Sequence, residues 1–240
     1  MPKLQPMPMD DQTVVVTGGT GALGTAVVAR LLQDRARVIV PVLERETPHR
    51  FPFAGHERVK LVHDVDLGDE AQVIEFYEQV PALWGSIQIA GGFAMAPLAE
   101  TSMDAFEQMW RMNVATCFMC CREAVARMRL RSTGEPGGRI VNVASRAALV
   151  PAAGMVAYAT AKAGVVALTL ALAEELADEA IYVNAIAPSV IDTKANRDAM
   201  PHADHSRWPK PEGLAEQIVA LVRPSNTCVR GAVIPTYGRG

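Results

Sequence analysis

The sequence predicts an α/β protein made of a single doubly wound domain, with about seven parallel strands and helices on both faces of the sheet. Apolar runs of strand length alternate with longer amphipathic stretches along the whole chain, as in parallel strands joined by helical crossovers. Half of the residues are hydrophobic while only 5% are aromatic, which is typical of buried strands covered by helices. The length of 240 residues favours one large domain over two small ones.

The predicted strands are short and apolar, whereas the predicted helices have longer amphipathic patterns. The strands cover residues 13–17, 37–42, 58–63, 86–90, 139–144, 181–187 and 229–235. The helices cover residues 22–34, 69–80, 102–131, 154–176 and 211–222. Ligands of such sheets bind beyond the carboxyl ends of the strands, so unusual residues at those positions are the candidates for function.

Two segments lie outside this alternation. Residues 1–12 are polar and rich in Pro and Met, and we expect them to form a flexible arm before the folded domain of residues 13–240. Residues 194–210 are polar and contain two prolines. We expect a loop there that closes over a substrate and excludes water; the alternative is a plain surface loop.

Charge, cysteine spacing and apolar stretches limit the class of protein. The net charge of −3 gives no basic footprint for nucleic acid or an anionic membrane. Three of the four cysteines fall in one stretch of five residues, 117–121, inside a predicted helix, and they have no histidine partners. Neither a disulfide framework nor a metal site is therefore expected. The first residues lack the apolar core of a secretory signal, and residues 163–173 are too short to span a bilayer. We therefore expect a cytoplasmic protein with a small-molecule ligand and no metal.

The turn after the first predicted strand has the composition of a phosphate-binding loop. Glycines permit a tight turn and let backbone N–H groups approach a pyrophosphate at the start of the next helix. Glycine patterns alone are weak signals, but here the turn follows a strand and opens a helix. The candidate cofactor-binding residues of this turn are Gly18, Thr20, Gly21, Ala22, Leu23 and Gly24.

The end of the second predicted strand is the position that normally separates NAD from NADP. An acidic residue there binds the ribose 2′-hydroxyl, whereas a nearby arginine accommodates a 2′-phosphate. Val42 and Leu43 can do neither. Glu44 would favour NAD and Arg45 would favour NADP, but both also fit a solvated loop. The sequence therefore leaves the choice between NAD and NADP open.

Acidic and small residues follow the third and fourth predicted strands. Asp64, followed by Val65, lies where a carboxylate can accept a hydrogen bond from the adenine amino group, although a turn or capping aspartate fits equally. Ala90, Gly91 and Gly92 remove side chains where the cofactor ribose would pass. We expect these five residues to line the dinucleotide site.

Tyr158 and Lys162 lie four residues apart on a predicted helix, and therefore on the same face. Free tyrosine has a pKa near 10, and an adjacent ammonium is expected to lower it by favouring the phenolate. Such a pair is common on helices, but Ser145 ends a strand 13 residues before Tyr158 at the same edge of the sheet. Its hydroxyl can hold a substrate carbonyl oxygen while Tyr158 delivers a proton; the alternative is a helix cap.

Asn113 is a mediocre helix former among apolar neighbours in the predicted helix 102–131. A relay through water to Lys162 would explain its presence, and so would a core amide with satisfied hydrogen bonds. We include Asn113 among the candidate catalytic residues.

These motifs occur in the order typical of the short-chain dehydrogenase/reductase superfamily, which the sequence resembles over nearly its whole length. The resemblance implies a Rossmann-like, dinucleotide-binding catalytic domain that transfers a hydride between NAD or NADP and a carbonyl or alcohol substrate. By this resemblance Tyr158 is the proton donor, and Lys162 activates it and anchors the ribose. Ser145 stabilises the carbonyl, and Asn113 is the relay residue.

The same resemblance places Pro188, Ile191 and Thr193 at the cofactor, with the last two at its nicotinamide end. It also implies a homodimer or homotetramer formed through the two long helices. Three positions depart from the superfamily pattern: Ala22, Ile89 and Ser189. These changes are small or apolar, so we expect them to retune cofactor packing rather than abolish binding.

A narrower resemblance is to dihydropteridine reductases, which use NADH to reduce quinonoid dihydropterin. It rests on residues 18–24, 90–93 and 192–208. Those reductases lack the catalytic serine, whereas this chain has Ser145, and Val42 stands where an acidic residue is expected. A reductase of ordinary carbonyls therefore fits better. A third hypothesis, a dinucleotide-sensing protein without turnover, is disfavoured because the acid–base residues are retained.

Overall fold

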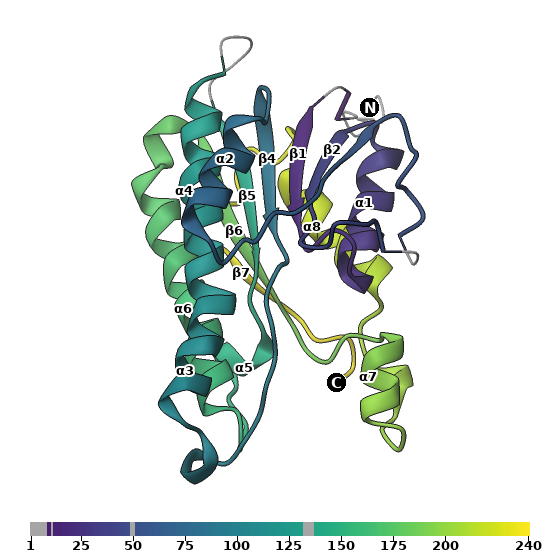
Figure 1. Cartoon of the computed structure of the whole chain (residues 1–240), viewed down its shortest axis with the longest axis vertical. Coiled ribbons are helices and arrows are strands. Elements are labelled where there is room, and N and C mark those ends of the chain that lie inside the picture. The colour runs from purple at the N-terminus through teal and green to yellow at the C-terminus, as the bar shows by residue number, and fades with distance from the viewer. Residues whose placement is uncertain (1–8, 11, 49–50, 132–136) are drawn as a thin grey trace.

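The computed structural model describes residues 9–10, 12–48, 51–131 and 137–240. These residues form one sheet of seven parallel strands in the order β3-β2-β1-β4-β5-β6-β7 (Figure 1). The strands are β1 Thr13–Thr17, β2 Arg37–Pro41, β3 Val59–Val62, β4 Leu83–Gln88, β5 Gly138–Val143, β6 Ile181–Pro188 and β7 Val233–Thr236. The predicted fold class is confirmed, and each predicted strand overlaps an observed one.

Helices cover both faces of the sheet (Figure 1). They are α1 Ala22–Gln33, α2 Glu70–Glu78, α3 Met103–Trp110, α4 Thr116–Arg129, α5 Arg146–Leu149, α6 Val156–Glu175, α7 Lys194–Ala199 and α8 Pro211–Val222. Helices α1 and α8 pack on one face, and α2, α4 and α6 pack on the other. Successive strand residues point to opposite faces: Val15 joins the core under α2, α4 and α6, while Val14 and Val16 join the core under α1 and α8.

The predicted helix 102–131 is interrupted by a π-helical turn. Helix α3 runs into residues Arg111–Ala115, which are π-helical, and α4 follows directly. Ser102 caps the start of α3 by accepting a hydrogen bond from the Ala105 amide at 3.1 Å. A π turn inserts one extra residue into the helical ladder and is common at functional sites; here it contains Asn113.

Two predicted segments are more ordered than the sequence suggested. The predicted loop 194–210 contains α7 and a short 3₁₀ turn, because the Thr193 side chain caps α7 by accepting from the Asn196 amide at 3.2 Å. At the end of the predicted arm, Met9 is fully buried and its amide donates to the Asp34 carbonyl at 2.8 Å. Residues 1–8 and 11, which make up most of that arm, lie outside the described residues.

The last strand begins later than predicted, at Val233 instead of residue 229. The Val229 amide donates to the Asn226 side chain at 2.9 Å, which holds this stretch in a turn. Gly231 then adopts a positive φ of 66°, a conformation that interrupts a regular strand.

Helix α6 has the length and composition of a membrane-spanning helix, with a mean hydropathy of 1.6 over its best window. It nevertheless carries Lys162, which is only 6% exposed, and packs against β5 and β6. These contacts place one face of α6 against the sheet, although only 28% of its apolar window is buried.

The first prediction concerns Gly24, where α1 packs directly on the turn that precedes it. A Cβ at this position would lie 2.1 Å from the Gly18 carbonyl oxygen and 2.6 Å from the Gly19 Cα, with no flexible side chain to move. Gly24→Ala is therefore expected to lower the free energy of unfolding by about 3 kcal/mol. Gly213→Ala in α8 is the control, since nothing lies within 4 Å of its added Cβ; it should be neutral or stabilise by up to about 1 kcal/mol. Urea denaturation measures both, and equal stability of the two variants would contradict this packing argument.

Candidate active site

The candidate site lies at the edge of the sheet where the central strands end. Thr17, the last residue of β1, ties this edge together: its hydroxyl accepts hydrogen bonds from the amides of Ile89 and Ala90 at 3.1 and 3.2 Å. The turn after β1 is thereby fixed against the segment after β4. Both are segments that the sequence assigns to the dinucleotide.

The glycine turn is closely packed against β4. Gly18 has a φ of +64°, and a Cβ there would lie 3.0 Å from the Ala90 nitrogen. Gly21 is the N-cap of α1, with Ala22 and Leu23 in the first turn of the helix, so the free amides of the helix start face the end of the sheet. Such a helix start favours a pyrophosphate, and the cradle therefore fits a dinucleotide.

A cavity of about 590 Å³ extends from this turn along the ends of β1, β2 and β4. Gly18, Thr20, Val65, Ala90 and Gly91 line it, as the sequence predicts for cofactor-binding residues. Its wall also includes Val42, Leu43 and Glu44 on one side and Gln108, Arg111, Met112 and Thr116 on the other. The second group was missed, because the fold alone brings the π turn opposite the end of β2.

Asp64 lies beside this cavity in an unusual backbone conformation, with a φ of +56°. Its carboxylate is 63% exposed and pairs with Arg45 at 3.3 Å. Neither side chain is part of the cavity wall, whereas Glu44 is. The expected contact between Asp64 and adenine stays a prediction.

Ser145, Tyr158 and Lys162 come together at the end of β5. Ser145 precedes α5 and accepts a hydrogen bond from the Ala147 amide at 3.2 Å, so it is a helix cap and a neighbour of Tyr158 at once. Lys162 lies one turn after Tyr158 on α6, with its Nζ 6.0 Å from the centre of the tyrosine ring. The Lys162 ammonium donates to the Val143 carbonyl at 2.8 Å, which ties α6 to β5.

Burial changes the acidity of both groups. It raises the pKa of Tyr158, and the Ser145 hydroxyl offsets this only in part by favouring the phenolate. The predicted lowering of the Tyr158 pKa is therefore not observed: burial sets the direction of the shift, and Lys162 is not among the groups that cause it. Burial also lowers the pKa of Lys162 from 10.5 to about 8, which the Cys117 thiol opposes.

Asn113 connects the π turn to the segment after β4. Its Nδ2 donates to the carbonyls of Gly92 and Met109 at 3.1 and 3.0 Å. Its Oδ1 is buried without a partner among the described residues. A Cβ on Gly91 would lie 2.6 Å from this oxygen and 3.5 Å from the Lys162 Nζ, so the oxygen and the ammonium face the same small space. A buried acceptor of this kind normally has a water or ligand partner.

The profile of the short chain dehydrogenase family matches residues 12–204 of this sequence. The chain belongs to the short-chain dehydrogenase family. It is therefore an oxidoreductase, and its cofactor is NAD or NADP.

Relatives and solved structures of the family cover almost the whole chain. The uncharacterized oxidoreductase YxjF of Bacillus subtilis (strain 168) is 29% identical over 237 residues, 95% of this chain and 90% of the relative. The BbsD subunit of (2S)-[(R)-hydroxy(phenyl)methyl]succinyl-CoA dehydrogenase from Thauera aromatica is 30% identical over 249 residues, 97% of each chain. A short-chain dehydrogenase/reductase from Serratia marcescens has a TM-score of 0.84 at 27% identity, over 96% of this chain and 98% of that one.

The remaining predicted cofactor residues lie at the end of β6 and directly after it. Pro188 is the last residue of β6 and is buried. Ile191 packs against the core under α1 and α8, and its carbonyl accepts from the Asn196 side chain at 2.8 Å. Thr193 uses its hydroxyl to cap α7. Their contacts with the nicotinamide stay predictions.

Phe93 is a site residue that the sequence analysis did not assign. Its ring packs edge-on against Tyr158, with ring centres 4.9 Å apart. Such aromatic contacts exclude water from one side of the phenol. The available signal was the aromatic residue directly after Gly91 and Gly92, but only the fold shows which side chain it meets.

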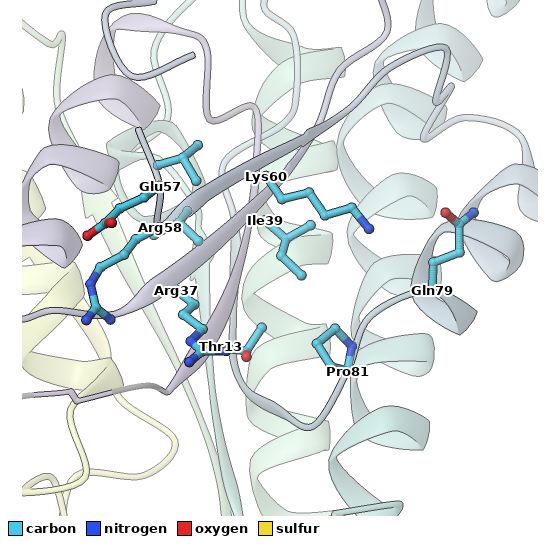
Figure 2. Close-up of a pocket in the computed structure, with 10 residues that line it drawn as sticks. Thr13, Arg37, Ile39, Glu57, Arg58, Lys60, Gln79 and Pro81 are labelled. Carbon is cyan, nitrogen blue, oxygen red and sulfur yellow. The ribbon is translucent and has the colours of Figure 1, made fainter. Parts of the chain in front are cut away.

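Another cavity, of about 600 Å³, lies at the opposite edge of the sheet, where β1, β2 and β3 begin. Figure 2 shows Thr13, Arg37 and Lys60 around it, with Gln79 and Pro81 on the far side. It is remote from Tyr158 and takes no part in the site described above.

The second prediction concerns the buried charge of Lys162. Because an ammonium is better solvated in the unfolded chain, the wild type below pH 8 carries a penalty of about 3 kcal/mol. Lys162→Met removes it and loses one hydrogen bond, worth about 1 kcal/mol. The variant should therefore be more stable than the wild type by about 2 kcal/mol near pH 7. The folded protein loses this proton near pH 8 and the unfolded chain near pH 10.5, so the difference should shrink between these values.

Urea denaturation near pH 7 and near pH 10 measures this difference. Lys60→Met, on the exposed side of β3, is the matched control and should change stability by less than about 0.5 kcal/mol. A Lys162→Met protein less stable than the wild type near pH 7 would show that the ammonium stabilises the fold.

Proposed function

We propose that this dehydrogenase interconverts carbonyl compounds and alcohols with Tyr158 as the general acid–base residue. The observation that carries the proposal is the assembly of Ser145, Tyr158 and Lys162 at the strand ends, next to the glycine cradle. When bound, the nicotinamide ring supplies or accepts the hydride. Gly18, Thr20 and Gly21 would hold the pyrophosphate side of the cofactor, and Pro188, Ile191 and Thr193 its nicotinamide end.

Tyr158 is suited to act as an acid in the direction of reduction. Its raised pKa keeps the phenol protonated at neutral pH, so it has a proton to deliver to a carbonyl oxygen. The Ser145 hydroxyl donates to the same oxygen and stabilises the negative charge that develops there. Phe93 keeps water from one side of the phenol.

Lys162 and Asn113 support this proton transfer. With a pKa of about 8, Lys162 is mostly protonated at neutral pH, and its charge stabilises the phenolate left on Tyr158. The unpartnered Asn113 Oδ1 beside the ammonium provides a place for a water that returns a proton from solvent.

The cavity wall favours NADH over NADPH as the reductant. Glu44 lines the cavity at the end of β2, where its carboxylate would repel a 2′-phosphate. Arg45, the residue that would favour NADP, pairs with Asp64 outside that wall. Fluorescence titrations with NADH and NADPH should give the lower Kd for NADH; tighter NADPH binding would sink this assignment.

Ser145 separates the proposed function from its alternatives. A hydroxyl next to Tyr158 serves an ordinary carbonyl, and the D-threitol dehydrogenase of Mycolicibacterium smegmatis, 28% identical over 239 residues, is named for an alcohol substrate. A dinucleotide sensor has no use for a complete acid–base set. A cytoplasmic location is proposed because α6, the one helix among the described residues that is long and apolar enough to span a membrane, packs against β5 and β6 of the sheet.

We also propose a homodimer or homotetramer formed through α4 and α6. Phe118 on α4 and Leu170 on α6 are 47% and 44% exposed, and apolar helix faces of this kind are typical of subunit contacts. Light scattering of the purified protein measures the mass, and a monomer at micromolar concentration would contradict the proposal.

The third prediction tests the role of Tyr158. Tyr158→Phe removes the proton donor and keeps the ring against Phe93, so kcat for carbonyl reduction should fall by at least about 100-fold. The Kd for NADH should change by less than about threefold, because the cradle is untouched. Ser145→Ala should lower kcat by about 10-fold to 100-fold through loss of one donor.

Cofactor oxidation with a panel of aldehydes, ketones and quinonoid dihydropterin measures these effects. Turnover unchanged in Tyr158→Phe would overturn the mechanism. Turnover restricted to the pterin would favour the dihydropteridine reductase alternative, and NADH binding without any turnover would favour the sensor.

A further inference from the structure

Arg146 directly follows Ser145 and is the one charged residue of the segment 137–161 besides Arg139. It is half-buried, and its guanidinium lies over the ring of Tyr237, 5.2 Å from the ring centre. Among the described residues it makes no ion pair. A guanidinium without an acidic partner keeps N–H donors with which it can bind an anion.

The surrounding sequence offers no internal partner for Arg146. No Asp or Glu occurs between residues 136 and 173. The nearest acid beyond β6 in the sequence, Asp192, already accepts hydrogen bonds from the Nε and Nη2 of Arg197. Among the described residues the charge of Arg146 is thus left without an acidic partner, in the residue that directly follows Ser145.

The Tyr237 ring under Arg146 is held in place by the loop after β6. The Ser189 hydroxyl donates to the Tyr237 carbonyl at 2.8 Å. Gly238 then adopts a φ of +65°, with room for no side chain because a Cβ would lie 2.8 Å from the Arg207 carbonyl oxygen. The Arg239 amide donates to that same oxygen at 2.8 Å, and the Arg207 side chain donates back to the Arg239 carbonyl at 2.9 Å.

These contacts join residues 189–210 to the segment after β7. The two joined segments, residues 189–210 and 237–240, contain five Lys and Arg but three Asp and Glu, in a chain with a net charge of −3. The excess of cations here runs against the charge of the whole protein, which favours a negatively charged ligand.

We propose that Arg146 binds a carboxylate or phosphate group of the substrate, so that this dehydrogenase prefers anionic carbonyl compounds to neutral ones. The inference rests on the proposed function, because it requires the substrate carbonyl at Ser145 and Tyr158. A guanidinium binds either anion through two parallel N–H donors. The Tyr237 ring contacts the guanidinium through a cation–π interaction, and no described residue accepts a hydrogen bond from its N–H groups, which leaves them for the anion.

Matched pairs of substrates test this inference. The carboxylate arm compares acetoacetate with methyl acetoacetate, and pyruvate with methyl pyruvate. The phosphate arm compares dihydroxyacetone phosphate with dihydroxyacetone. In at least one of the two arms, the wild type should reduce the anionic substrate with a kcat/KM about tenfold or more above that of its neutral counterpart. This is the effect expected of one charge-assisted contact. The arm with the larger ratio identifies the anion.

Arg146→Met should erase that ratio by lowering kcat/KM for the anionic member about 10-fold to 100-fold, while the neutral member changes less than about twofold. Arg146→Lys should recover part of the ratio, and Tyr237→Leu should raise KM for the anionic member alone. Arg37→Met, at the opposite edge of the sheet (Figure 2), is the matched control for loss of one positive charge and should leave the ratio unchanged. A purely structural role of Arg146 would lower both members of each pair equally and would overturn the inference.

The two levels of the proposal fail in different ways. Equal reduction of anionic and neutral members by the wild type would refute the role of Arg146 and leave carbonyl reduction through Tyr158 intact. No reduction of any member, with NADH bound, would refute the proposed function and the inference with it.

Discussion

Because all seven strands run parallel, their carboxyl ends share one edge of the sheet, and side chains far apart in the sequence meet there. The Thr17 hydroxyl bonds the two innermost ends, and the contact of Gly18 with Ala90 leaves no room for a side chain between them. The remaining parts of the site follow from this edge: Ser145 extends β5, and Pro188 ends β6. The glycine cradle and the residues that we propose as acid and base thus become neighbours, although they lie far apart in the sequence.

The second constraint is the ammonium of Lys162, buried between α6 and β5. Its bond to the Val143 carbonyl fixes the helix that carries Tyr158, but burial makes the charge unfavourable for folding. With the role proposed for Lys162, stability and chemistry make opposite demands at this position, as is common for functional residues. The Oδ1 of Asn113 is a similar case: it has no partner in the described part of the chain, and a buried oxygen of this kind weakens the fold unless something binds it.

The sequence was sufficient to predict the strands, the motifs that follow them and the proximity of Ser145 to Tyr158. Hydrophobic periodicity and the residues at strand ends are local properties that can be read from the sequence. The sequence was insufficient where distance in space decides. The direction of the Tyr158 pKa depends on how deeply the phenol is buried, and the contact with Phe93 depends on how the chain after β4 turns. The stacking of Arg146 on Tyr237 joins residues 91 positions apart, and no spacing rule predicts it.

The bounds of some helices could also not be predicted from local sequence patterns. The Thr193 cap converts part of an apparently irregular polar segment into α7, although the composition of that segment suggested a loop. Side-chain caps of this kind depend on a single rotamer, whereas amphipathic patterns average over many residues.

The π turn at Arg111–Ala115 has a consequence for comparing this chain with its relatives. Geometrically it equals a one-residue insertion in a continuous α-helix, and one residue corresponds to a rotation of about 100°. The faces of α4 are therefore rotated relative to those of α3 about their common axis. A single helical wheel drawn through both helices would assign residues to the wrong faces. A relative with one residue fewer in this stretch would need a regular helix, and its residue aligned with Asn113 would point away from Gly92. When such a relative is aligned with this chain, the one-residue gap therefore belongs where the π turn lies, because its place decides which residue corresponds to Asn113.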